Sequence, residues 1–222
     1  TKFIRDPFLK VTGGEMIVTN GNFYLVGGQN YDTVYSPSKE GIYTNAIRKF
    51  RLEQTNSTWT ISDTLSLKDT QNLHRRDFNL AEILLPNNED SLGAVIYGGV
   101  FTDKDLAYQN PVYISGLASG NPKVQVDTQM KQDVNLYSSA KINAILGTGS
   151  YRTNRTALLG GITYKALSTD SSALVIPPIS KALPFSNLMS SNYSDGENTI
   201  EIVQLPPNQL LPEYLGTNAV FF

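Results

Sequence analysis

Short apolar segments that each end in a pair of glycines recur along the chain. They occupy residues 23–28, 94–99 and 157–161. Roughly 60–70 residues separate one glycine pair from the next, a spacing that predicts tandem structural repeats. Glycine is expected where a strand leaves its sheet close to a neighbouring sheet, because any larger residue there would collide with that neighbour. The backbone at such a point also favours positive φ, which glycine adopts readily.

A β-hairpin is predicted before each of the three glycine pairs. In the first repeat, Asn20-Gly21 between two apolar runs is a strong signal for a two-residue hairpin turn. In the other repeats the turns are expected at 86–90 and 147–154. The strands expected after the glycine pairs are 45–52 and 59–62, then 111–115 and 123–126, and finally 199–205, which follows a long polar stretch.

The pattern indicates an all-β protein. Apolar and polar residues alternate with period two, turn signals recur, and no convincing amphipathic helix is visible. Four-stranded units in tandem are typical of β-propeller blades. We therefore expect blades over about 14–67, 75–130 and 138–206, plus a partial closing strand at 215–222.

The number of predicted blades bears on possible partners. Propellers typically close with about 4–8 blades, so three blades and partial units make only part of a ring. We expect the rest of a longer chain, or a second subunit, to complete it. The chain begins at Thr1 without an apolar leader, which suggests that a signal has been removed or that the sequence is a fragment.

Composition narrows the function classes. The 222 residues carry 18 Lys+Arg and a net charge of −2, so we expect no nucleic acid partner. No apolar run is long enough for a transmembrane helix, so we expect no membrane span. The chain has no cysteine and a single histidine, which excludes thiolate catalysis and cysteine zinc sites. We expect no metal and no cofactor.

The repeats resemble a known repeat family. The first contains the glycine pair, Tyr43 and Trp59, and this combination resembles the kelch repeat. The second keeps Tyr113 but lacks the tryptophan, and the third keeps Tyr164. The fold class implied is a kelch-like β-propeller.

A closer resemblance is to secreted kelch-type propellers of Bacteroidetes. The segments that carry it are 11–14, 23–29, 43–50, 74–79 and 98–101. The resemblance is strong up to about residue 115 and weaker after 130. It implies a secreted or cell-surface location. It does not imply a reaction, because the biochemical role of that family is not established.

Candidate binding residues precede the second predicted blade. In a kelch propeller, His74, Arg75, Arg76 and Asp77 would share one face with the loops 29–43 and 101–110. The arginines could donate to a carboxylate, phosphate or sugar. Alternatively, these residues are structural and join adjacent blades through backbone hydrogen bonds.

Aromatic and amide side chains in the same loops complete the candidate site. They are Gln29, Tyr31, Tyr43 and Tyr108. Such residues suit sugar stacking or protein contact, and the alternative is ordinary loop packing.

Two functions are compatible with this pattern. We favour a non-enzymatic binding or scaffold module that holds a protein or glycan with the loops of one propeller face. The alternative is a carbohydrate-active propeller enzyme (a hydrolase, lyase or sugar isomerase) with arginines and carboxylates around the channel. Converging buried carboxylates would favour the enzyme, and an exposed aromatic or apolar patch would favour the binding module.

Overall fold

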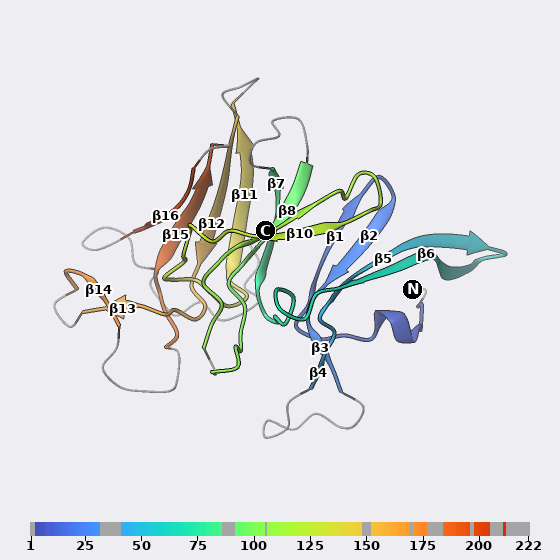
Figure 1. Ribbon diagram of the computed structural model, residues 1–222, viewed down its shortest axis with the longest axis horizontal. Coiled ribbons are helices and arrows are strands. Elements are labelled where there is room, and N and C mark those ends of the chain that lie inside the picture. The colour runs from blue at the N-terminus through green and yellow to red at the C-terminus, as the bar shows by residue number, and fades with distance from the viewer. Residues whose placement is uncertain are drawn as a thin grey trace.

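A computed structural model of the chain describes residues 3–31, 41–85, 92–104, 106–147, 152–168, 171–176, 184–195, 198–204 and 211. Its strands form three four-stranded antiparallel sheets arranged like propeller blades. The all-β prediction is confirmed, and so is the division into four-stranded units. The three sheets follow one another across the molecule in chain order (Figure 1).

The sheets are named in chain order. Sheet 1 contains β1 (Glu15–Thr19), β2 (Asn22–Val26), β5 (Ala46–Thr55) and β6 (Thr58–Lys68). Sheet 2 contains β7 (Asn79–Leu84), β8 (Leu92–Tyr97), β9 (Val112–Ser115) and β10 (Lys123–Val126). Sheet 3 contains β11 (Ala140–Leu146), β12 (Thr153–Leu159), β15 (Met189–Ser194) and β16 (Thr199–Val203).

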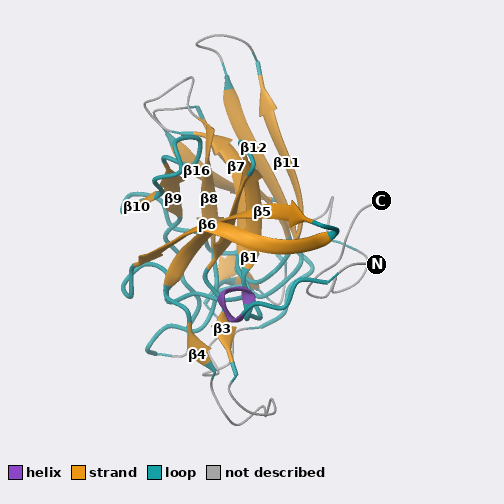
Figure 2. Ribbon diagram, turned by 90° about the vertical axis from the view of Figure 1, so that its right-hand side faces the viewer, coloured by secondary structure: helices purple, strands orange, loops and turns teal. Residues whose placement is uncertain are grey.

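Smaller elements lie between these strands. They are the 3-10 helix η1 (Pro7–Leu9), the two-stranded ribbon of β3 (Gln29–Asn30) and β4 (Ile42–Tyr43), and the ribbon of β13 (Ala166–Leu167) and β14 (Leu174–Val175). The β3–β4 ribbon extends from one end of the sheets, and the β11–β12 hairpin reaches the opposite end (Figure 2). We call the end where β2 stops and β5 starts the loop end.

The sequence failed to predict one strand of sheet 3, β15. Its buried residues alternate along the strand, but they are Ser190, Asn192 and Ser194. The buried face of β15 is therefore polar, and the alternating apolar pattern that predicts a strand is missing. The expected strand at 199–205 is present as β16. The closing strand expected at 215–222 lies outside the described residues.

The glycine pair that follows β2 lies between two close neighbours. Gly27 and Gly28 have φ of 56° and 77°, in the left-handed region. A Cβ on Gly27 would lie 2.8 Å from the carbonyl oxygen of Arg75, and one on Gly28 would lie 2.7 Å from that of Thr12. Neither position has room for a side chain. The predicted collision and the predicted positive φ are both confirmed here.

The same crossing recurs after β8. A Cβ on Gly98 would lie 2.5 Å from the carbonyl oxygen of Leu136, in the segment that leads to sheet 3. The backbone N–H of Gly28 donates to the carbonyl of Arg75 at 2.8 Å, and that of Gly99 donates to the carbonyl of Leu136 at 2.7 Å. The first two glycine pairs therefore each join their own sheet to the segment that leads into the next.

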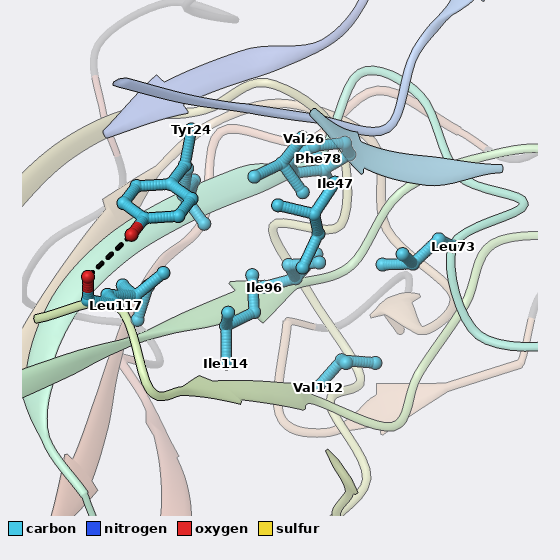
Figure 3. Packing of buried hydrophobic residues seen from close by; sticks show 11 residues of the cluster. Tyr24, Val26, Ile47, Leu73, Phe78, Ile96, Val112, Ile114 and Leu117 are labelled. Carbon is cyan, nitrogen blue, oxygen red and sulfur yellow. Dashed lines mark hydrogen bonds between the residues drawn. The ribbon is translucent and has the colours of Figure 1, made fainter. Parts of the chain in front are cut away.

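The contact between sheets 1 and 2 is apolar (Figure 3). Tyr24, Val26 and Ile47 of sheet 1 pack against Ile96 and Ile114 of sheet 2, and all five are almost completely buried. Burying a side chain of this size stabilises a fold by roughly 1.5–3 kcal/mol. This contact is the main core of the described structure.

The contact between sheets 2 and 3 is more polar. On sheet 2, Val95, Tyr97 and Tyr113 supply apolar surface, but Leu158 is the buried hydrophobic residue that sheet 3 adds to their cluster. The side-chain amide of Asn154 donates to the carbonyl of Leu84 at 2.7 Å and accepts from its N–H at 2.8 Å. A side chain thus takes the place of a strand partner for β7.

A substitution at the glycine crossing tests this account. We expect Gly98→Ala to lower the free energy of unfolding by roughly 3 kcal/mol or more, because the methyl group must displace the backbone of Leu136. Urea denaturation followed by circular dichroism measures the loss.

Gly21→Ala is the matched control. Gly21 has φ of 74°, close to the 67° of Gly98, but a Cβ there meets nothing within 4 Å. Its cost should be only the left-handed strain of about 1–2 kcal/mol. Equal losses for the two variants would contradict the role given to the close crossing.

Candidate functional site

Arg75 is the most buried charged residue of the predicted site, with 3% of its surface exposed. Its Nη1 donates to the carbonyls of Gly98 and Asn110 at 2.9 and 3.0 Å, and its Nε donates to that of Asn72 at 3.1 Å. The guanidinium also lies over the ring of Tyr108, 4.4 Å from its centre. Burial lowers the pKa of Arg75 to about 10, which leaves it charged at neutral pH. Backbone carbonyls therefore engage most of its donors.

Arg76 lies at the centre of a second set of contacts. Its Nε donates to the Tyr43 hydroxyl at 3.1 Å, and its Nη1 forms an ion pair with Asp77 at 3.0 Å. The ring of Phe101 lies 4.9 Å from the guanidinium carbon. Burial opposes the charge, but the Tyr43 hydrogen bond and the nearby Asp77 outweigh it and raise the pKa of Arg76. Its side chain is 23% exposed, so ligands can reach it.

Asp77 joins two of the blade-like sheets. Its backbone N–H donates to the carbonyl of Gly13, and its own carbonyl accepts from the N–H of Ser138. Its carboxylate faces Arg76 and forms a hydrogen bond with the hydroxyl of Tyr137. Burial raises the pKa of Asp77, and Arg76 and Tyr137 offset part of that rise. The side chain thus lies between a cation and a phenol.

The remaining predicted residues surround this pair on the sheet 1 side. The His74 and Tyr43 rings stack 3.9 Å apart, and His74 Nδ1 lies 2.9 Å from Asn45 Oδ1. Gln29 is buried, and its amide donates to the Tyr31 hydroxyl at 3.1 Å. Gln29 pairs with Tyr43 in the β3–β4 ribbon, and the Tyr43 hydroxyl accepts from Arg76. The ribbon is therefore held beside Arg76.

The predicted residues therefore converge in two groups. Gln29, Tyr31, Tyr43, His74, Arg76 and Asp77 form one connected network, which we call the Arg76 cluster. Arg75 and Tyr108 form the other, which is structural through its backbone contacts.

Sequence reasoning did not select as site candidates three aromatic residues beside the Arg76 cluster. Tyr137 contacts Asp77, and Phe101, Tyr137 and Tyr164 pack on one small apolar group of Val100, Ala107 and Leu136. Phe101 lies two residues after the second glycine pair and Tyr164 three residues after the third, and that position was the available signal. Tyr137 carried no signal, because it lies in a polar linker.

A second titratable cluster lies where sheet 3 meets the linker from sheet 2. The Glu201 carboxylate on β16 accepts a hydrogen bond from the backbone N–H of Asp133 at 2.6 Å. Lys165 pairs with the other carboxylate, that of Asp133, at 2.6 Å. Burial raises the pKa of Glu201 from 4.5 to about 7, and the Asp133 charge adds to the rise. Sequence reasoning did not single out any of these residues.

Buried amides accompany Glu201 in this region. Gln132 precedes Asp133, and Asn192 lies directly opposite Glu201 in the β15–β16 pairing. Both side chains are buried, and neither amide has a hydrogen-bond partner among the described residues. We call this group, with Ser190 and Ser194, the polar seam.

The described residues contain no group of three His, Cys, Asp or Glu side chains placed to hold a metal ion. None of their helices has the length and apolar character needed to cross a membrane. Comparison with known proteins finds no family model and no curated protein that matches the chain.

The two neighbouring arginines should respond differently to truncation. We expect Arg75→Ala to lower the free energy of unfolding by roughly 2–4 kcal/mol, because three carbonyl groups lose a charged donor. Arg76→Ala should cost about 1 kcal/mol, since its ion-pair partner Asp77 is partly exposed. Chemical denaturation of both variants makes the comparison, and a larger loss for Arg76→Ala would reverse the assignment.

Glu201 should make stability depend on pH. Its folded pKa is raised, so the folded protein binds this proton more tightly than the unfolded chain does. The stabilisation is complete below pH 4.5 and is lost as pH rises through about 7. The loss should be roughly 1–3 kcal/mol.

Glu201→Gln should remove this part of the pH dependence and raise stability at pH 8. Thermal unfolding between pH 4 and 8 measures it. Glu53→Gln, at an exposed carboxyl on β5, is the control and should leave the slope unchanged. An unchanged slope in Glu201→Gln would refute the assignment.

Proposed function

We propose that this chain is a kelch-type propeller segment of an exported or cell-surface protein, and that it acts as a non-enzymatic binding module. Its ligand, a glycan or a protein, binds at the loop end. The glycine pairs, the four-stranded sheets and the aromatic residues after each pair support the kelch assignment. The location comes from the sequence resemblance.

The Arg76 cluster is the single observation that carries the binding proposal. A half-buried guanidinium and a carboxylate are held side by side, and rings from loops of all three sheets surround them. This arrangement offers hydrogen-bond donors, acceptors and stacking surfaces within one small area. Residues on rigid sheets position it, while the loops carry the contacts.

A glycan is the ligand that this chemistry favours. Sugar hydroxyls both donate and accept, so they match a paired arginine and aspartate, and the apolar face of a sugar stacks on rings such as Phe101 and Tyr31. A protein partner would call for a broader apolar patch than these half-buried rings provide.

The enzyme alternative has less support. Glycoside hydrolysis needs two converging carboxyl groups. In the Arg76 cluster, Asp77 is the carboxylate, and it is engaged by Arg76 and Tyr137. Glu201 has the more strongly shifted pKa, but it belongs to the polar seam of sheet 3.

A glycan array followed by calorimetry tests the proposal. We expect the protein to bind a defined set of glycans, and Arg76→Ala and Phe101→Ala each to weaken binding at least tenfold. Such a loss corresponds to one charge-assisted hydrogen bond or one stacked ring.

Trp59→Ala is the control variant. Trp59 is an aromatic residue next to the β5–β6 turn, at the end of the sheets opposite the loop end. The Trp59→Ala variant should bind glycans as tightly as the unaltered protein does. If no glycan binds, but a protein binds through the same Arg76 and Phe101 side chains, the chain is still a binding module and its ligand is a protein. Binding that neither substitution weakens would overturn the site.

A further inference from the structure

Arg48 is a buried arginine on the face of sheet 1 that points away from sheet 2. Its neighbour on β5, Ile47, packs in the core that sheet 1 shares with sheet 2. Successive residues of a strand point to opposite faces, so Arg48 lies on the other face. It is only 8% exposed there, because residues 3–10 of the chain, which we call the N-terminal segment, lie over it.

The position that Arg48 occupies is apolar in sheet 2. Arg48 pairs with Leu25, which lies two residues before the first glycine pair. In sheet 2, Val112 pairs with Ile96, which lies two residues before the second. Val112 is completely buried in the core between sheets 1 and 2. An arginine at the corresponding place loses its hydration, so its charge requires a compensating partner.

The N-terminal segment engages only part of the Arg48 guanidinium. Nη1 donates to the carbonyls of Phe8 and Lys10 at 2.5 and 3.5 Å. The centre of the Phe8 ring lies 5.8 Å from the guanidinium carbon. Nε and Nη2 are buried as well, and neither has a hydrogen-bond partner in the part of the chain that the structure describes. The edge of the guanidinium that carries Nε and Nη2 is thus unused.

Arg75 is buried to a similar degree and differs in this respect. Its Nη1 and Nε both donate to backbone carbonyls, and its guanidinium lies over the ring of Tyr108. Arg48 has fewer such contacts. Burial lowers the pKa of Arg48, and no acidic group among the described residues offsets that shift. The partner that Arg48 lacks must accept hydrogen bonds and carry negative charge.

We propose that the Nε–Nη2 edge of Arg48 binds a small carboxylate ligand beneath the N-terminal segment. This edge presents two parallel N–H donors, which match the two oxygens of one carboxylate group. The segment itself carries two cations, Arg5 and Lys10. Its one acid, Asp6, accepts the backbone N–H of Phe8 at 2.8 Å instead of pairing with Arg48. The proposal is independent of any ligand at the loop end.

The cover over this edge is thin. None of the residues of η1 is buried. Met16 on β1 lies in the same cross-strand row as Leu25 and Arg48, and it is 52% exposed. The segment also borders an open hollow of about 430 Å³. The residues that line this hollow are Ile4, Arg5, Asp6, Pro7, Leu9 and Lys10. A shift of the segment, without opening of the core, would therefore admit an anion of a few atoms.

Thermal unfolding in sodium acetate and in sodium chloride at equal ionic strength tests the site. Acetate supplies two oxygens to the guanidinium, so it should raise the Tm more than chloride does. Arg48→Met should abolish this difference and should still fold, because its side chain is apolar like that of Val112. Arg48→Lys keeps the charge without the paired donors and should weaken acetate binding roughly tenfold or more. An acetate response in Arg48→Met equal to that of the unaltered protein would overturn the proposal.

Arg51→Met is the matched control on the same strand. The Arg51 side chain is half exposed, and its guanidinium donates to Asn22 and Asn20. Arg51→Met and Arg76→Ala should both respond to acetate as the unaltered protein does. Loss of the response in Arg76→Ala, with the response retained in Arg48→Met, would place the anion at the loop end and refute the Arg48 site.

Nuclear magnetic resonance of the Arg48 side chain gives a readout that does not depend on stability. The Nε–H signal of Arg48 in nitrogen-labelled protein is assigned by its loss in Arg48→Lys. Sodium acetate should shift this signal downfield and slow its exchange with solvent, whereas sodium chloride should not. A signal that stays unshifted at the acetate concentration that raises the Tm would show that acetate acts elsewhere, and it would refute the site.

Discussion

The close crossing at the first two glycine pairs is the constraint on which the rest of the structure depends. At Gly27 and Gly98 the backbone passes within van der Waals contact of the segment that leads to the next sheet. The hydrogen bonds from Gly28 and Gly99 then fix the spacing between sheets. Because a side chain has no room, the backbone sets how closely adjacent sheets approach at both crossings. The apolar packing of sheets 1 and 2 fills the space between them.

The crossing also explains why two neighbouring arginines differ. The carbonyl of Arg75 accepts the hydrogen bond of Gly28, so its side chain is directed inward among the carbonyls of Gly98 and Asn110. Arg76, one residue later, points to the other side of the chain and meets Tyr43 and Asp77. The crossing that joins the sheets thereby places Arg76 at the loop end and buries Arg75, which stabilises the fold.

Sequence patterns predicted the strands of the fold more completely than the roles of the site residues. The glycine pairs and apolar alternation were sufficient for sheets 1 and 2, because their strands carry apolar residues on the faces buried between the two sheets. β15 was not predicted, since its buried Ser190, Asn192 and Ser194 have the composition of a loop. Linear proximity grouped His74 to Asp77, but it could not separate Arg75 from Arg76, because their roles depend on where distant carbonyls lie. Glu201 and Asp133 meet only through folding.

The polar seam has a consequence for how the molecule opens. Sheets 1 and 2 share a continuous apolar core, whereas sheet 3 meets its neighbour through hydroxyls and amides, several of them without protein partners in the described structure. Such groups gain little from burial, so the second contact is the weaker one. Sub-global fluctuations will therefore detach sheet 3 as a unit before the rest unfolds, and its amide protons will exchange with solvent ahead of those of β2 and β8.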